Sequence, residues 1–192
     1  MNKNFENIIL ASTGAKDLCE IEEIQELWSG YGKIIRYRLT GTDRESVVVK
    51  HVRLPAEKKG GPRKKDISHQ RKVKSYRVEM AWYEKYAHRC DDTCRVPAFL
   101  GGRWQGDEFL MVFEDLDAAG FPLRKGLVSW CDVTACISWL AHFHGEFMGQ
   151  EPDSLWKQGT YWHLDTRPDE LKALEREDPA LKKAAGKIDQ LL

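Results

Sequence analysis

The residue with the clearest chemical potential is Lys50, which stands in a mostly apolar stretch at residues 47–52. A lysine in an apolar strand must either extend its ammonium to solvent or find an anionic partner, because an unpaired buried charge is costly. Glu79 lies at the edge of a downstream apolar helical stripe, about 40° around the helix from Tyr83, so it can face a sheet. Glu84, on the same predicted helix, is an alternative to Glu79 as the partner of Lys50. The sequence therefore predicts a strand ammonium with a helix carboxylate as its partner.

Further segments accompany this pair in a fixed order along the chain. They are Gly30-Tyr31-Gly32, Ser75-Tyr76-Arg77-Val78-Glu79-Met80-Ala81-Trp82-Tyr83, Phe109-Leu110-Met111-Val112-Phe113-Glu114-Asp115-Leu116 and Leu140-Ala141-His142-Phe143-His144. Taken with Lys50, this order resembles the choline kinase and aminoglycoside phosphotransferase superfamily, which has a protein-kinase-like fold. Within the superfamily it is most similar to the ecdysteroid-kinase-like group. The resemblance covers residues from about 28 to 165 and corresponds to the N-terminal portion of such a protein.

The resemblance implies a site for the phosphates of ATP. Lys50 would contact the α- and β-phosphates, and Glu79 would be the ion-pair partner that orients it. Gly30 and Gly32 would belong to a loop at residues 29–33 near the phosphates, where glycines allow unusual dihedral angles and the backbone supplies N–H donors.

The resemblance also implies a hinge for the adenine ring, formed by Glu114, Asp115 and Leu116. Backbone groups of this segment would hydrogen-bond the base. The whole protein would then be an ATP-dependent kinase that phosphorylates a small-molecule alcohol, with ATP and Mg²⁺ as cofactors.

The residues of the reaction centre are missing from this resemblance. Phosphoryl transfer in these proteins needs an Asp that positions the attacking hydroxyl, and an Asn and a second Asp that hold magnesium. His163-Leu164-Asp165 imitates the start of such a loop, but Glu170 stands where the Asn is required. The asparagines of the chain are Asn2, Asn4 and Asn7. We therefore assign no catalytic residue and no metal ligand, and expect a truncated chain that is inactive alone.

Two alternatives to a kinase fragment remain open. The first is a non-catalytic module that uses a kinase-like scaffold to bind other proteins. The second is an anionic-ligand or nucleic-acid binder, because residues 33–77 carry fifteen Lys or Arg against four acids, with the densest part at 58–74. Nucleic-acid binding usually adds interleaved aromatic residues, and that span contains only Tyr37 and Tyr76. We therefore expect no nucleic-acid partner and interpret the charge as a solvated loop.

The pattern of apolar residues predicts the elements that must position these groups. We expect a helix at 18–28, then an antiparallel hairpin of strands at 34–39 and 47–54 with a turn at 40–43. A long helix after residue 68 and a second hairpin, with strands at 98–104 and 109–113 and a turn at 105–107, come next. A helix at 130–147 and short helices opened by Pro168 and Pro179 follow. The predicted class is α+β: a kinase-like small lobe with its hinge at 1–116, an antiparallel sheet plus a long helix, then the helical start of an incomplete large lobe at 117–192.

Composition limits the remaining possibilities. The 192 residues carry thirty basic and thirty acidic side chains, so no net charge attracts nucleic acid or anionic lipid. No apolar run approaches the roughly 18 residues that span a bilayer, and we expect a cytoplasmic protein without a membrane partner. Five cysteines are an odd set in a chain of this size, which favours reduced thiols over disulfides or zinc.

Overall fold

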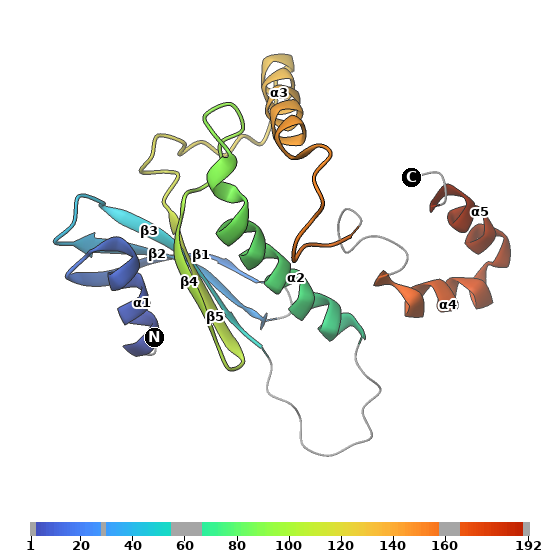
Figure 1. Cartoon of the computed structure of the whole chain (residues 1–192), viewed down its shortest axis with the longest axis horizontal. Coiled ribbons are helices and arrows are strands. Elements are labelled where there is room, and N and C mark those ends of the chain that lie inside the picture. Colours follow the sequence, from blue (N-terminus) through green and yellow to red (C-terminus); the bar gives the residue numbers. More distant parts are fainter. Residues whose placement is uncertain (1–2, 28–29, 55–66, 158–165, 190–192) are drawn as a thin grey trace. The chain divides into compact units, whose positions relative to one another are not determined.

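A computed structural model describes residues 3–27, 30–54, 67–157 and 166–189. Its elements are α1 (Lys3–Thr13), β1 (Asp17–Glu26), β2 (Gly32–Thr40), β3 (Ser46–Arg53), α2 (Ile67–Lys85), a 3-10 turn (Ala87–Arg89), β4 (Phe99–Gln105), β5 (Glu108–Glu114), α3 (Trp130–Phe147), α4 (Pro168–Glu177) and α5 (Pro179–Asp189) (Figure 1). The chain divides into two compact units, one made of Met1–Lys58 and Trp82–Gln150 and the other of Lys59–Ala81 and Glu151–Leu192. The α+β class predicted from the sequence is confirmed.

The first unit is built on a five-stranded antiparallel sheet with the order β1-β2-β3-β5-β4. β2 and β3 form one predicted hairpin, and β4 and β5 form the other, with the turn at Gly106 between them. β3 is the central strand and pairs with β5, so the two hairpins join along their inner strands. This arrangement places residues 47–52 in the middle of the sheet.

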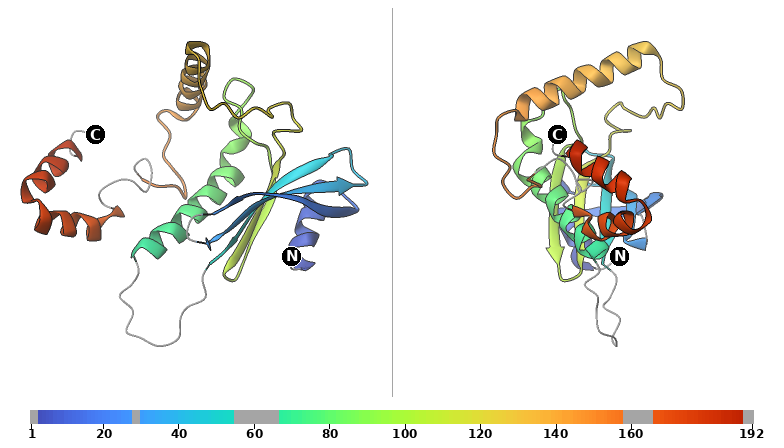
Figure 2. Two further views of the ribbon diagram at one scale, coloured as in Figure 1. Left: turned by 180° about the vertical axis from the view of Figure 1, so that it is seen from behind. Right: turned by 90° about the vertical axis from the view of Figure 1, so that its right-hand side faces the viewer.

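One face of the sheet carries the principal core, and α1 covers it (Figure 2). Phe5 and Ile9 of α1 pack with Val49 of β3 and Val112 of β5, and all four are almost completely buried. The sequence interpretation did not include this helix. A helix here is stabilised by burial of its apolar side against the sheet rather than by its own propensity.

The helix predicted at 18–28 is wrong, because residues 17–26 form the edge strand β1. The strand has two β-bulges, and its register against β2 skips Ile21 and Ile24. A bulge inserts one extra residue into a strand and so shifts the alternation of its side chains. Apolar residues consequently recur every three positions, a spacing that imitates a helix, although Ile21 and Ile24 remain 45% and 39% exposed.

The end of α2 and the helix α3 are linked within the first unit by aromatic side chains. Trp82 lies 5.9 Å from Phe143 and 6.3 Å from Phe147 between ring centroids, and Trp139 stacks on Phe143 at 5.0 Å. Trp139 also donates its indole N–H to the carbonyl oxygen of Arg95 at 2.9 Å. The predicted helix at 130–147 is therefore confirmed, and it contacts the α2–β4 connection along one side.

The second unit contains the first part of α2 together with α4 and α5. Arg71 of α2 donates to the carbonyl oxygen of Thr166 at 2.9 Å, and its guanidinium lies 3.3 Å from Glu170 of α4. The ammonium of Lys74 lies 4.2 Å from the ring centroid of Trp156. Pro168 and Pro179 begin α4 and α5, as the sequence predicts.

The lobe boundary expected between residues 116 and 117 stays a prediction. Both units take in segments from either side of that position. Across the part of the chain that the structure describes, no helix combines the length and the apolar character needed to cross a membrane.

Candidate nucleotide-binding site

Lys50 lies near the middle of β3, on the face of the sheet opposite α1. Its register neighbours are Ile34 of β2 and Met111 of β5, and Val48 and Val52 flank it on the same face of its own strand. Met111 and Val52 are completely buried, while Lys50 itself is half-buried. The ammonium therefore extends from an apolar part of the sheet, as the sequence predicts.

Glu79, the expected partner of Lys50, lies on α2 and is half-buried. The rival Glu84 is exposed near the end of the same helix. Lys50 belongs to the first unit and Glu79 to the second. Their ion pair stays a prediction.

The glycines of the predicted phosphate loop form the turn between β1 and β2. The N–H of Gly30 donates to the carbonyl oxygen of Leu27 at 3.1 Å, and the N–H of Leu27 donates to the carbonyl oxygen of Gly32 at 2.8 Å. Gly30 has φ +68° and Gly32 has φ +147°, both in the region that favours glycine. Trp28 and Ser29 lie outside the described residues. The N–H of Gly30 is thus engaged within the turn.

A Cβ added at Gly32 would lie 2.1 Å from the carbonyl oxygen of His51 and 2.8 Å from the Cα of Val52, both backbone atoms of β3. At Gly30 an added Cβ meets no atom within 4 Å. The two glycines therefore differ in role: Gly32 allows β2 to approach β3, and Gly30 shapes the exposed turn.

The predicted hinge follows β5 and is fixed by the carboxylate of Asp115. This side chain is 4% exposed and accepts from Nε of Arg36 at 2.8 Å, from Oγ of Ser46 at 2.7 Å and from the backbone N–H of Asp117 at 3.1 Å. Arg36 also pairs with Asp117 at 2.6 Å and with Glu22. The segment after β5 is therefore held against β2 and β3 by a largely buried ion-pair network.

Backbone carbonyl groups of the hinge also accept hydrogen bonds within the chain. The carbonyl oxygens of Asp115 and Leu116 accept from the N–H groups of Ala119 at 3.0 Å and Phe121 at 2.8 Å. Each carbonyl has a second lone pair, so both keep the capacity to accept from a ligand. The side chain of Glu114 points elsewhere and binds Arg95 at 2.7 Å and the N–H of Ala98 at 3.1 Å.

The ion pairs around Arg36 change the pKa of a neighbouring carboxyl group. The hydrogen bond from Arg124 lowers the pKa of Asp117, an effect that Arg36 reinforces and that partial burial opposes. The sequence interpretation missed Arg36. Arg36 alternates with the buried Ile35 and Tyr37, so its side chain lies on the opposite face of β2. Its main partner, Asp115, is 79 residues away, and a pattern within a short window cannot predict a contact over that separation.

Several expected features lie outside the described residues. They include the His163-Leu164-Asp165 sequence and most of the basic stretch at 58–74. Two described cations of the wider basic segment form ion pairs: Lys33 pairs with Glu23 at 2.6 Å and Arg53 pairs with Glu108 at 2.9 Å. Both cations are more than half exposed at the surface, and the nucleic-acid alternative stays untested.

All five cysteines are free thiols in the structure. Burial raises the pKa of Cys90 to about 11, and the neighbouring Cys94 adds to the effect. A thiol with so high a pKa is a poor nucleophile at neutral pH. In the four described ranges, no three His, Cys, Asp or Glu side chains gather in a group that could hold a metal ion.

A scan against models of known protein families matches none of them, and no curated protein matches the chain. The kinase-like assignment therefore depends on the residues and geometry described above.

Proposed function

We propose that this chain binds ATP and contains the nucleotide-binding small lobe of an ATP-dependent phosphotransferase that acts on a small-molecule alcohol. The observation that carries the proposal is the position of Lys50 on β3 of a five-stranded antiparallel sheet. In protein kinases the phosphate-binding lysine lies on the third strand and pairs with a glutamate of the next helix. Here the next element after β3 among the described residues is α2, which carries Glu79.

Each proposed residue has a limited physical task. The ammonium of Lys50 offsets negative charge on the phosphates, and the carboxylate of Glu79 holds that ammonium in place. Residues 114–116 offer backbone groups to adenine, and the contacts of Asp115 with Arg36 and Ser46 hold this segment before the nucleotide arrives. Magnesium, when bound in the complete protein, neutralises charge that develops on the phosphates. No described residue is assigned to activating the alcohol.

Nucleotide binding is tested with the Lys50→Met variant. We expect MgATP at about 100 times its Kd to stabilise the natural chain by about 2.7 kcal/mol, which corresponds to a rise of roughly 5–10 °C in the melting temperature. Lys50→Met should lose most of this rise, because the phosphates lose their cationic partner. The measurement is thermal unfolding followed by tryptophan fluorescence, with and without MgATP.

The matched control is Arg53→Met, which removes a cation from the same strand. Arg53 is 68% exposed and pairs with Glu108, on the face of β3 opposite Lys50. This variant should keep the full response to MgATP. An absent response in the natural chain, or an equal response in Lys50→Met, would contradict the proposal.

A second candidate, a kinase-like module that binds protein without catalysis, is favoured by exposed apolar side chains in α3 and on either side of it. The exposed large hydrophobic residues of this region are Phe121, Leu123, Leu127, Val128, Trp130, Ile137, Leu140 and Met148. No residue of α3 is fully buried in the described structure. A surface of this kind on a folded chain usually marks an interaction site.

The exposure of α3 predicts how the isolated chain behaves with a hydrophobic dye. We expect strong fluorescence of bound anilinonaphthalene sulfonate, and we expect the double variant Ile137→Glu, Leu140→Glu to reduce it several-fold, because two apolar contacts become charged. Thr134→Glu, which adds the same charge at an exposed polar position of α3, should leave most of the signal. Weak dye binding by a stable, monodisperse natural chain would contradict an accessible apolar face and remove the observation that favours the protein-binding module.

A further inference from the structure

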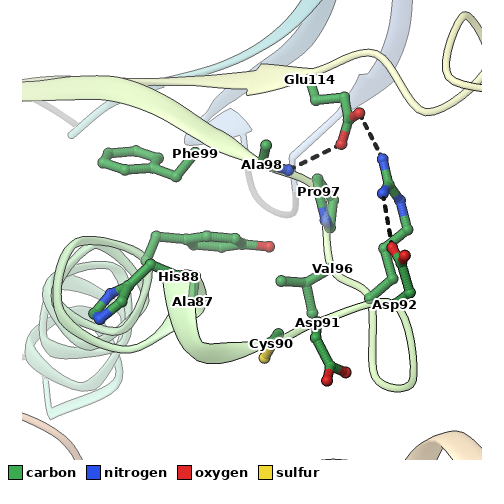
Figure 3. A pocket seen from close by; sticks show the side chains of 12 residues that line it. Ala87, His88, Cys90, Asp91, Asp92, Val96, Pro97, Ala98, Phe99 and Glu114 are labelled. Carbon is green, nitrogen blue, oxygen red and sulfur yellow. Dashed lines mark hydrogen bonds and ion pairs between the residues drawn. The ribbon is translucent and has the colours of Figure 1, made fainter.

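A pocket of about 430 Å³ lies in the first unit, away from Lys50 (Figure 3). It is enclosed by the end of α2, the connection at residues 87–98, the start of β4 and the end of β5. Its volume falls in the range typical of small-molecule sites. Neither the predicted phosphate loop nor Lys50 lines it, and only Glu114 is shared with the predicted hinge.

The pocket is formed by contacts that do not need a ligand. The N–H of Cys90 donates to the carbonyl oxygen of Ala87 at 3.1 Å, and the N–H of Cys94 donates to that of Asp91 at 3.2 Å, so the connection is folded into two tight turns. Trp139 holds the carbonyl oxygen of Arg95 at 2.9 Å. The N–H of Glu114 donates to Ala98 at 2.9 Å. A ligand therefore meets walls that are already positioned, which reduces the entropic cost of binding.

One side of the pocket is apolar and aromatic. The rings of Tyr83 and Phe99 lie 5.9 Å apart and are tilted by 30°, and Val96 and Pro97 add aliphatic surface. Figure 3 shows Phe99 across the pocket from Glu114 and Asp92. A flat apolar group can lie against this side of the pocket, and the faces of aromatic rings attract cations.

The other side carries an excess of negative charge. Arg95 stands between two carboxylates: its Nη2 lies 2.7 Å from Glu114, and its Nη1 lies 3.7 Å from Asp92. Glu114 is 15% exposed and Asp92 is 99% exposed, so one acid lies inside the pocket and the other at its edge. Asp91 also lines the pocket, and hydrogen bonds from Thr93 lower the pKa of its carboxyl group. Three acids therefore line the pocket with one guanidinium, which pairs with Glu114 and Asp92.

We propose that this pocket binds a small organic monocation, an amine whose ring-bearing body lies against Tyr83 and Phe99 and whose ammonium lies beside Glu114 and Asp92. The added positive charge compensates the acid that Arg95 leaves unneutralised, and the apolar body fills space that the fold keeps open. This inference does not depend on the proposed ATP site, because the residues that bind the two ligands differ except for Glu114.

The experiment compares two indole compounds of opposite charge, tryptamine and indole-3-acetate, on the full chain by ligand-observed NMR titration. We expect tryptamine to bind with a Kd on the order of 0.1–1 mM and indole-3-acetate to bind at least tenfold more weakly. Glu114→Gln should weaken tryptamine binding about tenfold, and Asp92→Asn about two- to threefold, because an exposed charge is better screened. Val96→Phe, which fills the pocket, should abolish binding.

The control is Asp107→Asn, an exposed acid in the β4–β5 turn that does not line the pocket and should leave the tryptamine Kd unchanged. Thermal unfolding of each variant shows whether it folds. If Val96→Phe does not fold, the Asp92→Asn variant and the pair of indole compounds decide the question. Equal binding of the two indoles, no tryptamine binding, or unchanged binding in a folded Val96→Phe would overturn the proposal.

Discussion

Replacing Asp115 by alanine is expected to lower the free energy of unfolding by about 3 kcal/mol, because removal of one partner from a buried ion pair leaves the other charge desolvated. In a domain of this size the melting temperature should fall by roughly 6–12 °C. Asp115 has the highest burial of any charged side chain in the described structure, and Arg36, its partner, is 17% exposed. Thermal and urea unfolding, followed by circular dichroism, measure the loss.

A second substitution separates the contribution of the Asp115 charge from that of its hydrogen bonds. Asp115→Ala removes the acceptor of Arg36, of the Ser46 hydroxyl and of the Asp117 N–H together. Asp115→Asn keeps an oxygen for the neutral donors but loses the negative charge, and we expect it to cost about 1–2 kcal/mol. If the two variants are equally destabilised, the charge of Asp115 dominates. If Asp115→Asn is neutral, the hydrogen bonds dominate.

Asp117→Asn is the matched control for Asp115, because it removes another acid from the same network. Its side chain is 30% exposed and also pairs with the exposed Arg124. Exposed ion pairs contribute little, so the loss of stability should be clearly smaller than for Asp115→Asn. An equal loss from the two Asn substitutions would show that burial of Asp115 does not determine its contribution.

The Asp115 variants also connect stability to the proposed function. The carboxylate holds the start of the segment that we assign to adenine, so its removal should reduce the MgATP response as well as the stability. Lys50→Met acts differently, since it should reduce the MgATP response with little loss of stability. The two variants therefore distinguish a residue that positions the site from one that contacts the nucleotide.

The sequence predicted the sheet well where hairpins are formed by local signals. The Gly41 turn between β2 and β3 and the Gly106 turn between β4 and β5 stand between stretches of β-forming residues, and both hairpins are present. Turn residues and strand propensity act over a few positions, so one sequence suffices to detect them. The same holds for the proline starts of α4 and α5.

The sequence failed where tertiary contacts decide the structure. β1 is a strand because its backbone pairs with β2, and its bulges gave the false helical spacing of Ile21 and Ile24. α1 depends on burial of Phe5 and Ile9 against strands that begin more than twenty residues later. The pairing of Asp115 with Arg36 joins positions 79 residues apart. Patterns within a short window contain none of this information.

The candidate site was predicted in its residue types but not in its supporting contacts. Lys50 lies among apolar neighbours, as a strand of valines indicates. Glu114 and Asp115 were assigned to a hinge through their backbone, and the structure gives their side chains different structural partners. Gly32 was assigned to a phosphate loop, and its closest approach is to β3. Resemblance to a family identifies positions, whereas the neighbours of each side chain are determined by the fold.

Gly32→Ala is expected to destabilise the first unit by about 3 kcal/mol or more, because the new methyl group meets backbone that cannot rotate away. The added Cβ would lie 2.1 Å from the carbonyl oxygen of His51. Relief requires β2 to move from β3 at a position where the register pairs Gly32 with Val52 and Lys33 with His51. The φ of +147° adds a conformational cost of its own.

Gly30→Ala gives the matched comparison, two residues away in the same turn. Its φ of +68° costs alanine about 1–2 kcal/mol, and no atom within 4 Å opposes the methyl group. Urea unfolding should therefore give a midpoint for Gly32→Ala well below that for Gly30→Ala. The difference between the two contains the steric clash with β3 together with the difference in conformational cost between φ +147° and φ +68°.

The same two variants distinguish a structural role of these glycines from a role in nucleotide binding. If the turn contacts phosphates, Gly30→Ala should reduce the MgATP response more than its modest loss of stability explains, because the methyl group projects from the exposed part of the turn. Gly32→Ala should reduce the response only as far as it unfolds or displaces β2 and, with it, the neighbours of Lys50. A normal response in Gly30→Ala would restrict the role of these glycines to chain geometry and would leave Lys50 as the principal phosphate contact.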